Sequence, residues 1–281
     1  MITFSNLGNL GRLGNQFFQY AAVRALALEK DLDLALPQPS TKTWHGQDCL
    51  LDNFNIPREL FKQSEGIKYA YIERDPFMYY SNFWEIPDNT DLQGFFQSTL
   101  YFGNHSETIK KELTPKKDLL DEAKSYVDLI RDNNKPVVSI HLRRGDNADH
   151  SNPSQKLNNM YDKNGDYFNY LNKALEIFPD CTYLVFAGGR RSEEGNEEDL
   201  DWCKKNLNIE ATYSSGSTMQ DFCRIMMCDH NILSPVSTFG WWAGYLNSSN
   251  KNKVVAPVKY HPDIDGYTHR KGFYPKEFIL L

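Results

Sequence analysis

The chain has 281 residues, of which 31 are Lys or Arg and 37 are Asp or Glu, so its formal net charge is −6 with histidine neutral. This surplus of carboxylates argues against a protein that binds nucleic acid or an anionic membrane through a basic surface. Hydrophobic residues form 40% of the sequence and charged residues 24%, which excludes a disordered or collagen-like chain. At roughly 100 to 200 residues per domain, the length fits one large domain or two modest ones.

The five cysteines are scattered and form no Cys-x-x-Cys pair, so we expect neither a disulfide framework nor a structural zinc site. The first residues lack a basic stretch leading into an apolar run, and no segment approaches the roughly 18 apolar residues of a membrane span. We therefore expect a cytoplasmic protein with no membrane span. The sequence leaves open its oligomeric state and any peripheral association with a membrane.

Apolar runs alternate with helix-like segments along the chain. Residues 2–4 predict a strand, and a turn with three glycines leads into a helix over 15–30. A charged helical segment over 108–134 ends in a polar stretch closed by proline, which favours a domain boundary there. The later predictions are strands at 135–142, 182–187 and 230–233, and helices at 167–178, at 200–207 and near 241–246.

This strand–helix alternation indicates βαβ units and parallel sheets, so the predicted fold class is α/β. The boundary divides the chain into two domains, 1–135 and 136–281. In open parallel sheets, ligands bind at the carboxyl ends of the strands. The segments that follow predicted strands are therefore the expected places for a site.

The turn before the first helix contains Gly8, Gly11 and Gly14, directly before Asn15. Glycines between a strand and a helix let a ligand approach the backbone. Asp31 follows Gly11 by twenty residues, the spacing expected of an acidic residue that binds a ribose. The glycine spacing does not match G-x-G-x-x-G, so a dinucleotide site is the weaker interpretation. Glycines that only shape a turn are the alternative.

The sequence His-Leu-Arg-Arg-Gly-Asp at 141–146 ends a predicted strand. Side chains alternate across a strand, so His141 and Arg143 share one face and Arg144 lies on the other. Arginine can fork onto phosphate oxygens and imidazole can bond a base or ribose, so the first two residues suit an anionic ligand with a ring. We expect Arg144 to hold the turn by pairing with Asp146 or the backbone. A structural ion-pair cluster without a ligand is the alternative.

A second strand end reads Ser-Pro-Val-Ser-Thr-Phe-Gly-Trp-Trp-Ala at 234–243. Ser237 or Thr238 can cap the helix that follows, and the free N–H groups there would cradle a phosphate. Trp241 and Trp242 could stack on a sugar, but we expect both to be core residues.

Other patterns are discounted. The D-x-D pairs at 31–33 and 263–265 do not follow predicted strands, so we expect no metal site. We interpret the acidic stretch at 192–199 as a solvated loop. No G-x-S-x-G, H-E-x-x-H or P-loop sequence supports a hydrolase or an NTPase.

Three blocks, at 11–21, 141–146 and 237–242, resemble the signature blocks of the α-1,2-fucosyltransferases of glycosyltransferase family 11. The resemblance runs in order along the whole chain. The histidine–arginine block alone also occurs in protein O-fucosyltransferases and α-1,6-fucosyltransferases. Shorter matches lie at residues 51–56, 94–98, 101–102, 254–257 and 273–275.

The resemblance implies a GT-B fold, in which two Rossmann-like domains face a central cleft. It also implies a metal-independent, inverting transfer of L-fucose from GDP-β-L-fucose to the 2-hydroxyl of a galactoside in an oligosaccharide or lipid-linked glycan. The N-terminal domain would be the acceptor side and the C-terminal domain would bind GDP-fucose. No cofactor is implied, because GDP-fucose is a substrate.

The resemblance also assigns roles to residues. Arg143 corresponds to the residue that binds the donor diphosphate, and His141 to one that contacts the guanosine. Asp221 corresponds to a carboxylate that accepts from the guanine N1 and N2 donors, with a carboxylate in the first turn of a helix as the alternative. Asn15 corresponds to a residue that reaches the donor from the other domain, and we expect it to be catalytic together with Arg143. The other expected donor-binding residues are Gly14, Ser237, Thr238 and Phe239.

The base that removes the acceptor proton stays unassigned, because Asp146 is the nearest carboxylate and the arginines beside it favour an ion pair. The chain departs from the family pattern twice. Residues 186–189 read Phe-Ala-Gly-Gly where Phe-Ser-Asp-Asp is usual, and Asn147 replaces an aromatic residue. The alternatives are a fucosyltransferase of different linkage or acceptor, a non-catalytic nucleotide-sugar or glycan-binding relative, and an NAD-linked oxidoreductase.

Overall fold

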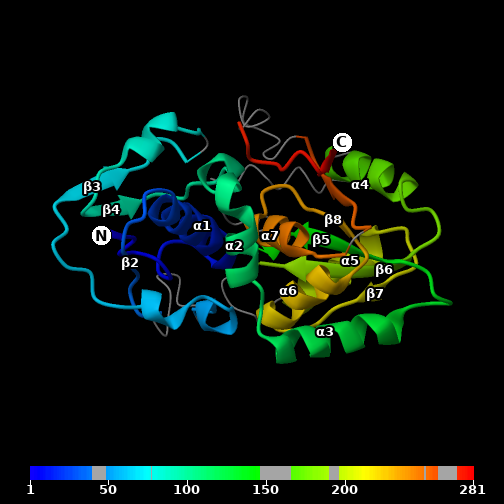
Figure 1. Cartoon of the computed structure of the whole chain (residues 1–281). Helices are drawn as coiled ribbons and strands as arrows, with labels where there is room; N and C mark the ends of the chain where they lie inside the picture. Colours follow the sequence, from blue (N-terminus) through cyan, green and yellow to red (C-terminus); the bar gives the residue numbers. More distant parts are fainter. Residues whose placement is uncertain (40–48, 77, 146–165, 190–195, 250, 259–270) are drawn as a thin grey trace. The chain divides into compact units, whose positions relative to one another are not determined.

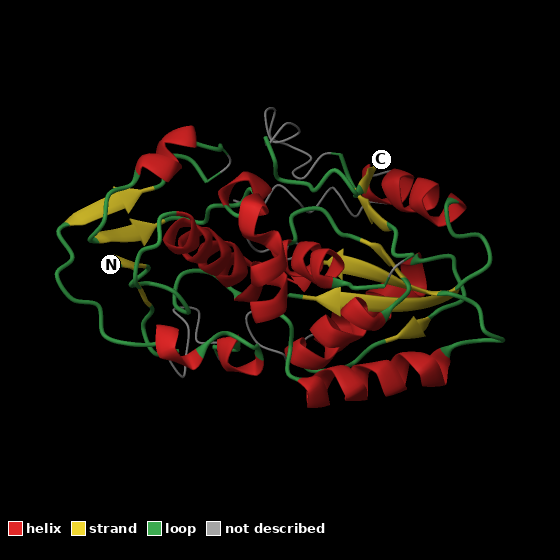
Figure 2. Cartoon of the chain, in the orientation of Figure 1, coloured by secondary structure: helices red, strands yellow, loops and turns green. Residues whose placement is uncertain are grey.

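The computed structural model describes residues 1–39, 49–76, 78–145, 166–189, 196–249, 251–258 and 271–281. The chain forms two compact units. Unit 1 consists of Met1–Lys116 and His269–Pro275, and unit 2 of Lys117–Thr268 and Lys276–Leu281. Each unit contains its own parallel sheet with helices beside it (Figure 1, Figure 2). The α/β class predicted from the sequence is therefore confirmed.

Unit 1 is built on a four-stranded parallel sheet in the order β2-β1-β4-β3. Its strands are β1 (Ile2–Thr3), β2 (Leu34–Ala35), β3 (Tyr69–Ile72) and β4 (Thr90–Gln93). In this sheet, Ile2 lies in register with Leu34 on one side and with Thr90 on the other. The strand order therefore reverses between β1 and β4, which is where open parallel sheets bind ligands.

Helix α1 (Leu13–Glu29) connects β1 to β2. Its residues Phe17, Phe18 and Tyr20 point in different directions around the helix and are all 0% exposed, so the helix is buried on more than one side. Helix α2 (Ser106–Glu112) packs against α1, and the ring of Phe273 stacks on that of Phe18 with 6.1 Å between centroids. The unit also contains 3-10 helices at η1 (Leu51–Asn53), η2 (Arg58–Leu60), η3 (Ser81–Glu85), η4 (Thr99–Tyr101) and η5 (Gly103–His105).

Unit 2 is built on a six-stranded parallel sheet in the order β10-β9-β8-β5-β6-β7. Its strands are β5 (Val137–Arg143), β6 (Thr182–Gly188), β7 (Thr212–Tyr213), β8 (His230–Ile232), β9 (Val254–Ala256) and β10 (Ile279–Leu280). Its helices are α3 (Lys117–Ile130), α4 (Asp166–Glu176), α5 (Asn196–Asn206), α6 (Thr218–Met227) and α7 (Thr238–Leu246). Strand order reverses between β5 and β8, because the chain first builds outward through β6 and β7 and then crosses to the other side of β5.

The division between the units differs from the predicted boundary at 135/136, because it falls at Lys116 and Lys117. The expected helical segment over 108–134 is two helices, of which α2 belongs to unit 1 and α3 to unit 2. Helix α3 packs against α6, so it shares a core with the second sheet.

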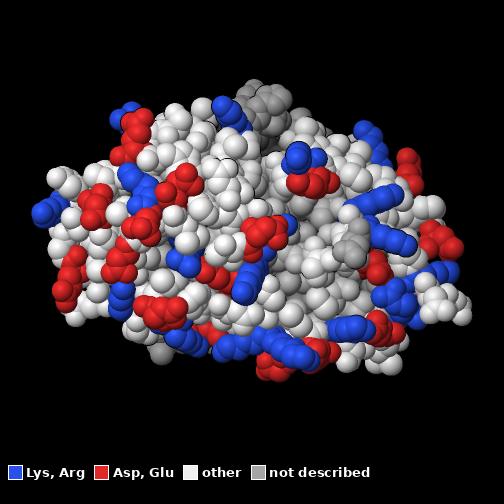
Figure 3. All heavy atoms as spheres, viewed as in Figure 1, with Lys and Arg blue, Asp and Glu red and all other residues white. Residues whose placement is uncertain are grey.

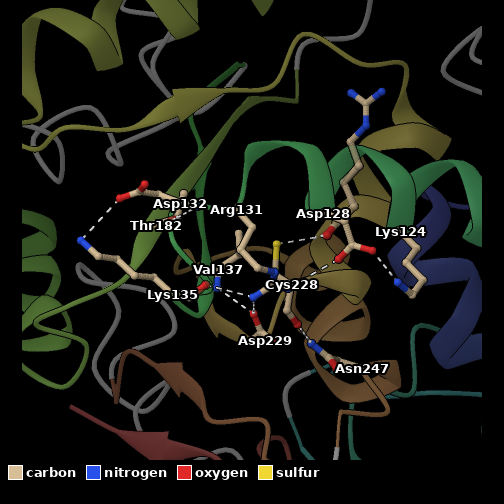
Figure 4. A network of polar contacts seen from close by, with 11 residues as sticks. Lys124, Asp128, Arg131, Asp132, Lys135, Val137, Thr182, Cys228, Asp229 and Asn247 are labelled. Carbon is tan, nitrogen blue, oxygen red and sulfur yellow. Dashed lines mark hydrogen bonds and ion pairs between the residues drawn. The ribbon is translucent and has the colours of Figure 1, made fainter.

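The polar stretch that was expected to mark the domain boundary is the connection from α3 to β5, and an ion pair holds it in place (Figure 4). The Arg131 guanidinium donates to Asp229 Oδ2 at 2.6 Å and to the Lys135 carbonyl at 3.0 Å. The same Asp229 oxygen accepts from the Val137 N–H at 2.7 Å, at the start of β5. These contacts hold the connection against the residue before β8, at the end of the sheet opposite the carboxyl ends of the strands.

The structure tests the expected burial of the tryptophan pair and the expected solvation of the acidic stretch at 192–199. Trp241 and Trp242 are 1% and 0% exposed, so both are core residues, as expected. The acidic stretch is not simply a solvated loop, because its last residues open helix α5 and Asp199 is buried against Arg144. Its residues 192–195 lie outside the described residues.

The distribution of surface charge and the state of the cysteines are as the sequence led us to expect. On the face shown in Figure 3, acidic and basic side chains are interspersed, without an extended basic field. All five cysteines lie in the described part of the chain and are free. No helix among the described residues is long and apolar enough to cross a membrane.

Candidate active site

The candidate site of unit 2 lies where its strand order reverses, at the carboxyl ends of β5 and β8. His141 and Arg143 end β5, and the turn after β8 leads into α7. The Ser234 hydroxyl accepts a hydrogen bond from the Arg143 N–H at 2.9 Å, which ties the end of β5 to that turn. Open α/β sheets bind ligands in this crevice.

Arg143 is half-buried and turns toward the end of β6. Its Nη1 donates to the Gly189 carbonyl at 2.6 Å. Gly188 and Gly189 have φ angles of 148° and 105°, and a Cβ on Gly189 would lie 1.7 Å from Arg143 Nη1. The glycine pair that departs from the family pattern therefore makes room for the guanidinium, whose planar fork of N–H donors suits phosphate oxygens.

His141 is buried, with 6% of its surface exposed. Its Nδ1 has no hydrogen-bond partner among the described residues. Burial, together with the positive charge of Arg143, lowers the pKa of His141 to about 3, so the ring is neutral at physiological pH. A Cβ on Gly240 would lie 2.6 Å from Nδ1, so a glycine is needed at that position of α7.

The N-terminus of α7 lies at the same edge of the sheet, after the carboxyl end of β8. Ser237, one of the two cap residues that the sequence allowed, is its N-cap and accepts from the Gly240 N–H at 3.2 Å. Thr238 and Phe239 occupy the first turn and are half-buried. The first N–H groups of a helix lack intrahelical partners and carry partial positive charge, so this end of α7 favours an anion. Val236, just before it, has a φ of 51°, a strained value for a β-branched residue of the kind that gathers at functional sites.

Asp221 lies in the first turn of α6, as the alternative interpretation of its sequence stated. Its Oδ1 accepts from the Ser214 hydroxyl at 2.6 Å, and 18% of the side chain is exposed. Burial raises the pKa of Asp221 to about 7, outweighing the lowering effects of Ser214 and Arg224. The carboxyl group therefore changes charge within the physiological range.

Phe239 connects these parts of the site. Its ring centroid lies 5.7 Å from that of His141 and 5.2 Å from that of Phe222, the residue after Asp221. Helices α6 and α7 both begin after the carboxyl end of a strand, so their N-termini lie at the same edge of the sheet. The structure thus brings the six predicted unit 2 residues to one edge: His141, Arg143, Asp221, Ser237, Thr238 and Phe239.

The predicted residues of unit 1 lie at the corresponding position of its own sheet. Asn15 is in the first turn of α1, and its Oδ1 accepts from Gln97 Nε2 at 2.9 Å. Gln97 follows β4, so this pair marks the point where the strand order of unit 1 reverses. Gly14 is buried beside Asn15.

The glycine turn before α1 has a structural explanation. Gly8 and Gly11 have φ angles of 83° and 78°, and Gln16 Nε2 donates to the carbonyls of both, at 3.3 and 3.1 Å. A Cβ on Gly11 would lie 2.7 Å from Asn15 Nδ2. The turn therefore brings its backbone close to the asparagine, and only glycine leaves room for that approach.

Other residues escaped the sequence analysis because their partners are distant in the chain. Arg144 pairs with Asp199 at 3.3 Å and lies over the Trp202 ring at 3.6 Å, and the sequence predicted neither partner. Its expected pairing with Asp146 stays a prediction. Asp199 also accepts from the Gly145 N–H at 3.1 Å, so this pair fixes the turn after β5. Asp146, Asn147 and the D-x-D pair at 263–265 lie outside the described residues. Gln97, the partner of Asn15, was also not predicted as a site residue. It does lie within the stretch at 94–98 that resembles the family, so the sequence contained some indication of it.

Within the described part of the chain, no group of three or more His, Cys, Asp or Glu side chains is arranged to hold a metal ion. The site instead combines an arginine, a helix N-terminus, an aromatic ring and a carboxyl group at a sheet edge. An arginine and a helix N-terminus at the point of strand reversal suit an anionic ligand, such as the phosphates of a nucleotide.

Comparison with known proteins gives the family. The sequence matches Glycosyl transferase family 11 over residues 4–278, and the chain belongs to that family. An Escherichia coli α-1,2-colitosyltransferase is 26% identical, with the alignment covering 89% of this chain and 90% of the relative. The rat galactoside α-(1,2)-fucosyltransferase 2 is 25% identical over 85% of this chain and 66% of its own length.

Solved structures show that the fold is shared with fucosyltransferases. A POFUT1 crystal structure in complex with GDP matches with a TM-score of 0.53 at 13% identity, covering 91% of this chain and 97% of that one. An Arabidopsis thaliana FUT1 variant in complex with GDP matches with a TM-score of 0.51 at 12% identity, covering 91% and 70%.

Proposed function

We propose that this glycosyltransferase moves L-fucose from GDP-β-L-fucose to the 2-hydroxyl of a galactoside in a glycan, with inversion and without a metal ion. The observation that carries the proposal is that Arg143, at the end of β5, and the N-terminus of α7 both lie at the strand reversal of unit 2, where the Arg143 N–H donates to Ser234 in the turn before α7. Membership of family 11 and the names of the relatives support the type of transfer.

The proposed reaction forms one bond at C1 of fucose and breaks another, and protein groups stabilise the charge on the leaving diphosphate. The acceptor oxygen attacks C1 of fucose on the face opposite the diphosphate, the bond from C1 to the phosphate oxygen breaks, and its electron pair leaves with GDP. Arg143 and the N–H groups around Ser237 meet the charge that develops on the leaving diphosphate. Removing one such preorganised donor costs on the order of 10²–10³ in rate. These groups supply positive charge at the place where a metal would otherwise be used.

The acceptor hydroxyl must also lose its proton, and the base stays unassigned. Arg143 cannot accept a proton, because a guanidinium stays charged at every pH of interest. His141 is buried and its pKa is about 3, which makes it a weak base. We assign it instead to the guanosine, as a neutral hydrogen-bonding group.

The remaining roles follow from the placement of each residue. Asp221 would accept from the guanine N1 and N2 donors, with Phe239 beside the nucleoside, and Thr238 would bond a phosphate or the fucose. In unit 1, Asn15 and Gly14 would reach the donor across the central cleft of a GT-B arrangement. Unit 1 would then provide the acceptor side and unit 2 the donor side.

GDP-colitose is a second candidate donor, and the name of one relative suggests it. The E. coli relative is a colitosyltransferase, and colitose is L-fucose without its 3-hydroxyl. GDP-colitose would place the same diphosphate and guanine on the same residues of unit 2, so those residues do not distinguish the two sugars. A different linkage or acceptor, and a non-catalytic nucleotide-sugar-binding relative, are the further alternatives.

A panel of GDP-sugars tests the proposal. The purified protein is incubated with GDP-fucose, GDP-colitose, GDP-mannose or UDP-galactose and with lactose or another β-galactoside, with and without EDTA. We expect GDP release and an α-1,2-linked product from GDP-fucose, at the same rate in EDTA. A preference for GDP-colitose selects the second candidate, while a requirement for Mn²⁺ or turnover only of UDP-galactose overturns the proposal.

A further inference from the structure

Asp221 is hydrogen-bonded to a chain of polar side chains that the proposed reaction does not use. Arg224 is 7% exposed and lies one turn further along α6. Its Nη1 donates to the Ser214 hydroxyl at 3.0 Å, and that hydroxyl donates to Asp221 Oδ1 at 2.6 Å. Ser214 is buried after the carboxyl end of β7.

The direction of these hydrogen bonds is fixed by chemistry. An arginine only donates, so the Ser214 oxygen accepts from it and turns its single hydrogen toward Asp221. Asp221 Oδ1 must then be an acceptor, which favours the ionised carboxylate. Arg224 Nη1 lies 3.9 Å from the same Oδ1, so its charge acts in the same direction.

Arg224 is itself held firmly. Its Nη2 donates to Glu122 Oε1 on α3 at 2.9 Å, and its guanidinium lies over the Tyr126 ring at 3.8 Å. A Cβ on Gly216 would lie 2.6 Å from both Arg224 Nη1 and Asp221 Oδ1. The turn between β7 and α6 thus leaves space for these two side chains to meet beside Ser214.

We propose that Arg224 is a positioning residue that, through Ser214, holds Asp221 as an oriented carboxylate and thereby gives the site its preference for guanine. This inference rests on the proposed contact of Asp221 with the nucleobase. Guanine presents two adjacent N–H donors, which match the two oxygens of a carboxylate. Hypoxanthine lacks the exocyclic amine and presents only one. A carboxyl group that is protonated or free to rotate loses the second acceptor, so it no longer distinguishes the two bases.

The test compares the binding of GDP with that of inosine diphosphate by titration calorimetry at pH 8. A hydrogen bond to a charged group corresponds to roughly a 10- to 100-fold difference in affinity, so we expect wild-type protein to prefer GDP by about that factor. Arg224→Met should reduce the preference to about threefold or less, mainly by weakening GDP binding. Arg224→Lys should recover part of it, because a lysine can still donate to Ser214.

The matched control is Arg24→Met in unit 1, which also removes a largely buried arginine paired with a glutamate and should leave the preference unchanged. A merely structural role of Arg224 would weaken both nucleotides equally, so an unchanged ratio in Arg224→Met overturns the inference. If that variant does not fold, Ser214→Ala interrupts the same connection and leaves the contacts of Arg224 with Glu122 and Tyr126 intact. Wild-type protein that binds GDP without preferring it also overturns the inference, whereas wild-type protein that binds neither nucleotide overturns the proposed donor site.

Discussion

Arg143 illustrates how one side chain depends on its neighbours at residue scale. The Arg143 guanidinium fits in its place only because Gly189 has no Cβ. The backbone N–H of Arg143 donates to the Ser234 hydroxyl. The strand end therefore fixes both the start and the tip of the side chain. A preorganised cation of this kind stabilises developing charge without having to move during the reaction.

Replacing Arg143 should remove that stabilisation. We expect Arg143→Ala to lower kcat/KM for fucosyl transfer by at least about 10²-fold. Arg143→Lys keeps the charge but not the fork of donors, so it should recover only part of the activity. Initial rates with GDP-fucose and lactose measure the effect, and circular dichroism verifies that the variants fold. Wild-type rates in Arg143→Ala would show that the diphosphate binds elsewhere.

Asp221 gives donor binding a pH dependence. Its pKa is raised to about 7, so the fraction that is ionised rises from roughly one tenth at pH 6 to nine tenths at pH 8. The proposed guanine contact needs the ionised form, so we expect GDP-fucose to bind about ninefold more tightly at pH 8 than at pH 6. Calorimetry at a series of pH values measures the change.

The control is Asp221→Asn, whose affinity should be low and flat over the same range. Linkage requires the opposite trend in the stability of the unliganded protein. The folded state holds the Asp221 proton up to about pH 7, while the unfolded chain releases it near pH 4, so this group's contribution to stability is present below pH 4 and is lost as the pH rises to 7. Affinity that fell with rising pH would contradict the assignment of Asp221 to the nucleobase.

At the scale of elements, α1 and α2 are joined by an ion pair. The Arg24 guanidinium donates to Glu112 at 2.8 and 3.1 Å, and the Tyr20 hydroxyl donates to the same carboxylate at 2.5 Å. All three side chains are largely buried. Burial and the adjacent carboxylate also raise the pKa of Tyr20 well above its ordinary value, so it stays protonated as a donor.

Removing the shared acceptor should destabilise unit 1. Glu112→Ala leaves the Arg24 charge and the Tyr20 hydroxyl buried without their partner, which costs about 3–5 kcal/mol. Removing the charge as well, in Arg24→Met with Glu112→Leu, should recover most of that loss. Urea denaturation followed by circular dichroism measures both variants. Equal stability of Glu112→Ala and wild type would show that water replaces the carboxylate.

Pattern and chemistry predicted the longer elements well. The helix expected at 15–30 is Leu13–Glu29, and the strand expected at 135–142 is Val137–Arg143, because long periodic segments carry a strong local signal. The strand-end position of His141 and the N-cap role of Ser237 followed from the same signals. Strands β2 and β10 have only two residues each and show no period, so the sequence did not predict them, whereas the equally short β1 lies within the strand expected at 2–4.

The remaining misses share a physical cause. Arg144 and Asp199 are separated by 55 positions, and Arg131 and Asp229 by 98, so local sequence says nothing about either pair. Because of the first pair, part of the acidic stretch at 192–199 is buried instead of solvated. The second pair holds the polar stretch before β5 against the sheet of unit 2. Packing of α3 on α6 likewise decided the boundary between the units, which polar composition alone had placed too late in the chain.

At the scale of the whole molecule, the two sheets repeat one design, with functional candidates at the reversal of strand order in each. The residues proposed to bind the donor nucleotide are concentrated in unit 2, at the end of β5 and at the starts of α6 and α7. Ligand binding should therefore stabilise those segments more than the rest of the chain.

Hydrogen exchange with mass spectrometry measures that distribution. Saturating GDP should slow exchange in peptides covering 139–145, 212–224 and 234–241. The same concentration should protect them less in Arg143→Ala, because a weaker ligand stabilises the folded state less. Adding the full GDP-sugar should extend protection to the peptide containing Asn15. Protection confined to unit 1 would place the nucleotide on the other sheet.

The return of residues 269–275 to unit 1 has a consequence for how this protein can be taken apart or recombined. Phe273 stacks on Phe18, and the Gly272 carbonyl accepts from the Thr99 N–H at 2.7 Å and from its hydroxyl at 2.6 Å. Unit 1 is therefore completed by a segment encoded more than 150 positions after its main part ends. A gene fragment for residues 1–116 would express a core that lacks one of its own aromatic side chains. Chimaeras with relatives should accordingly tolerate exchange of unit 1 only when both segments are exchanged together.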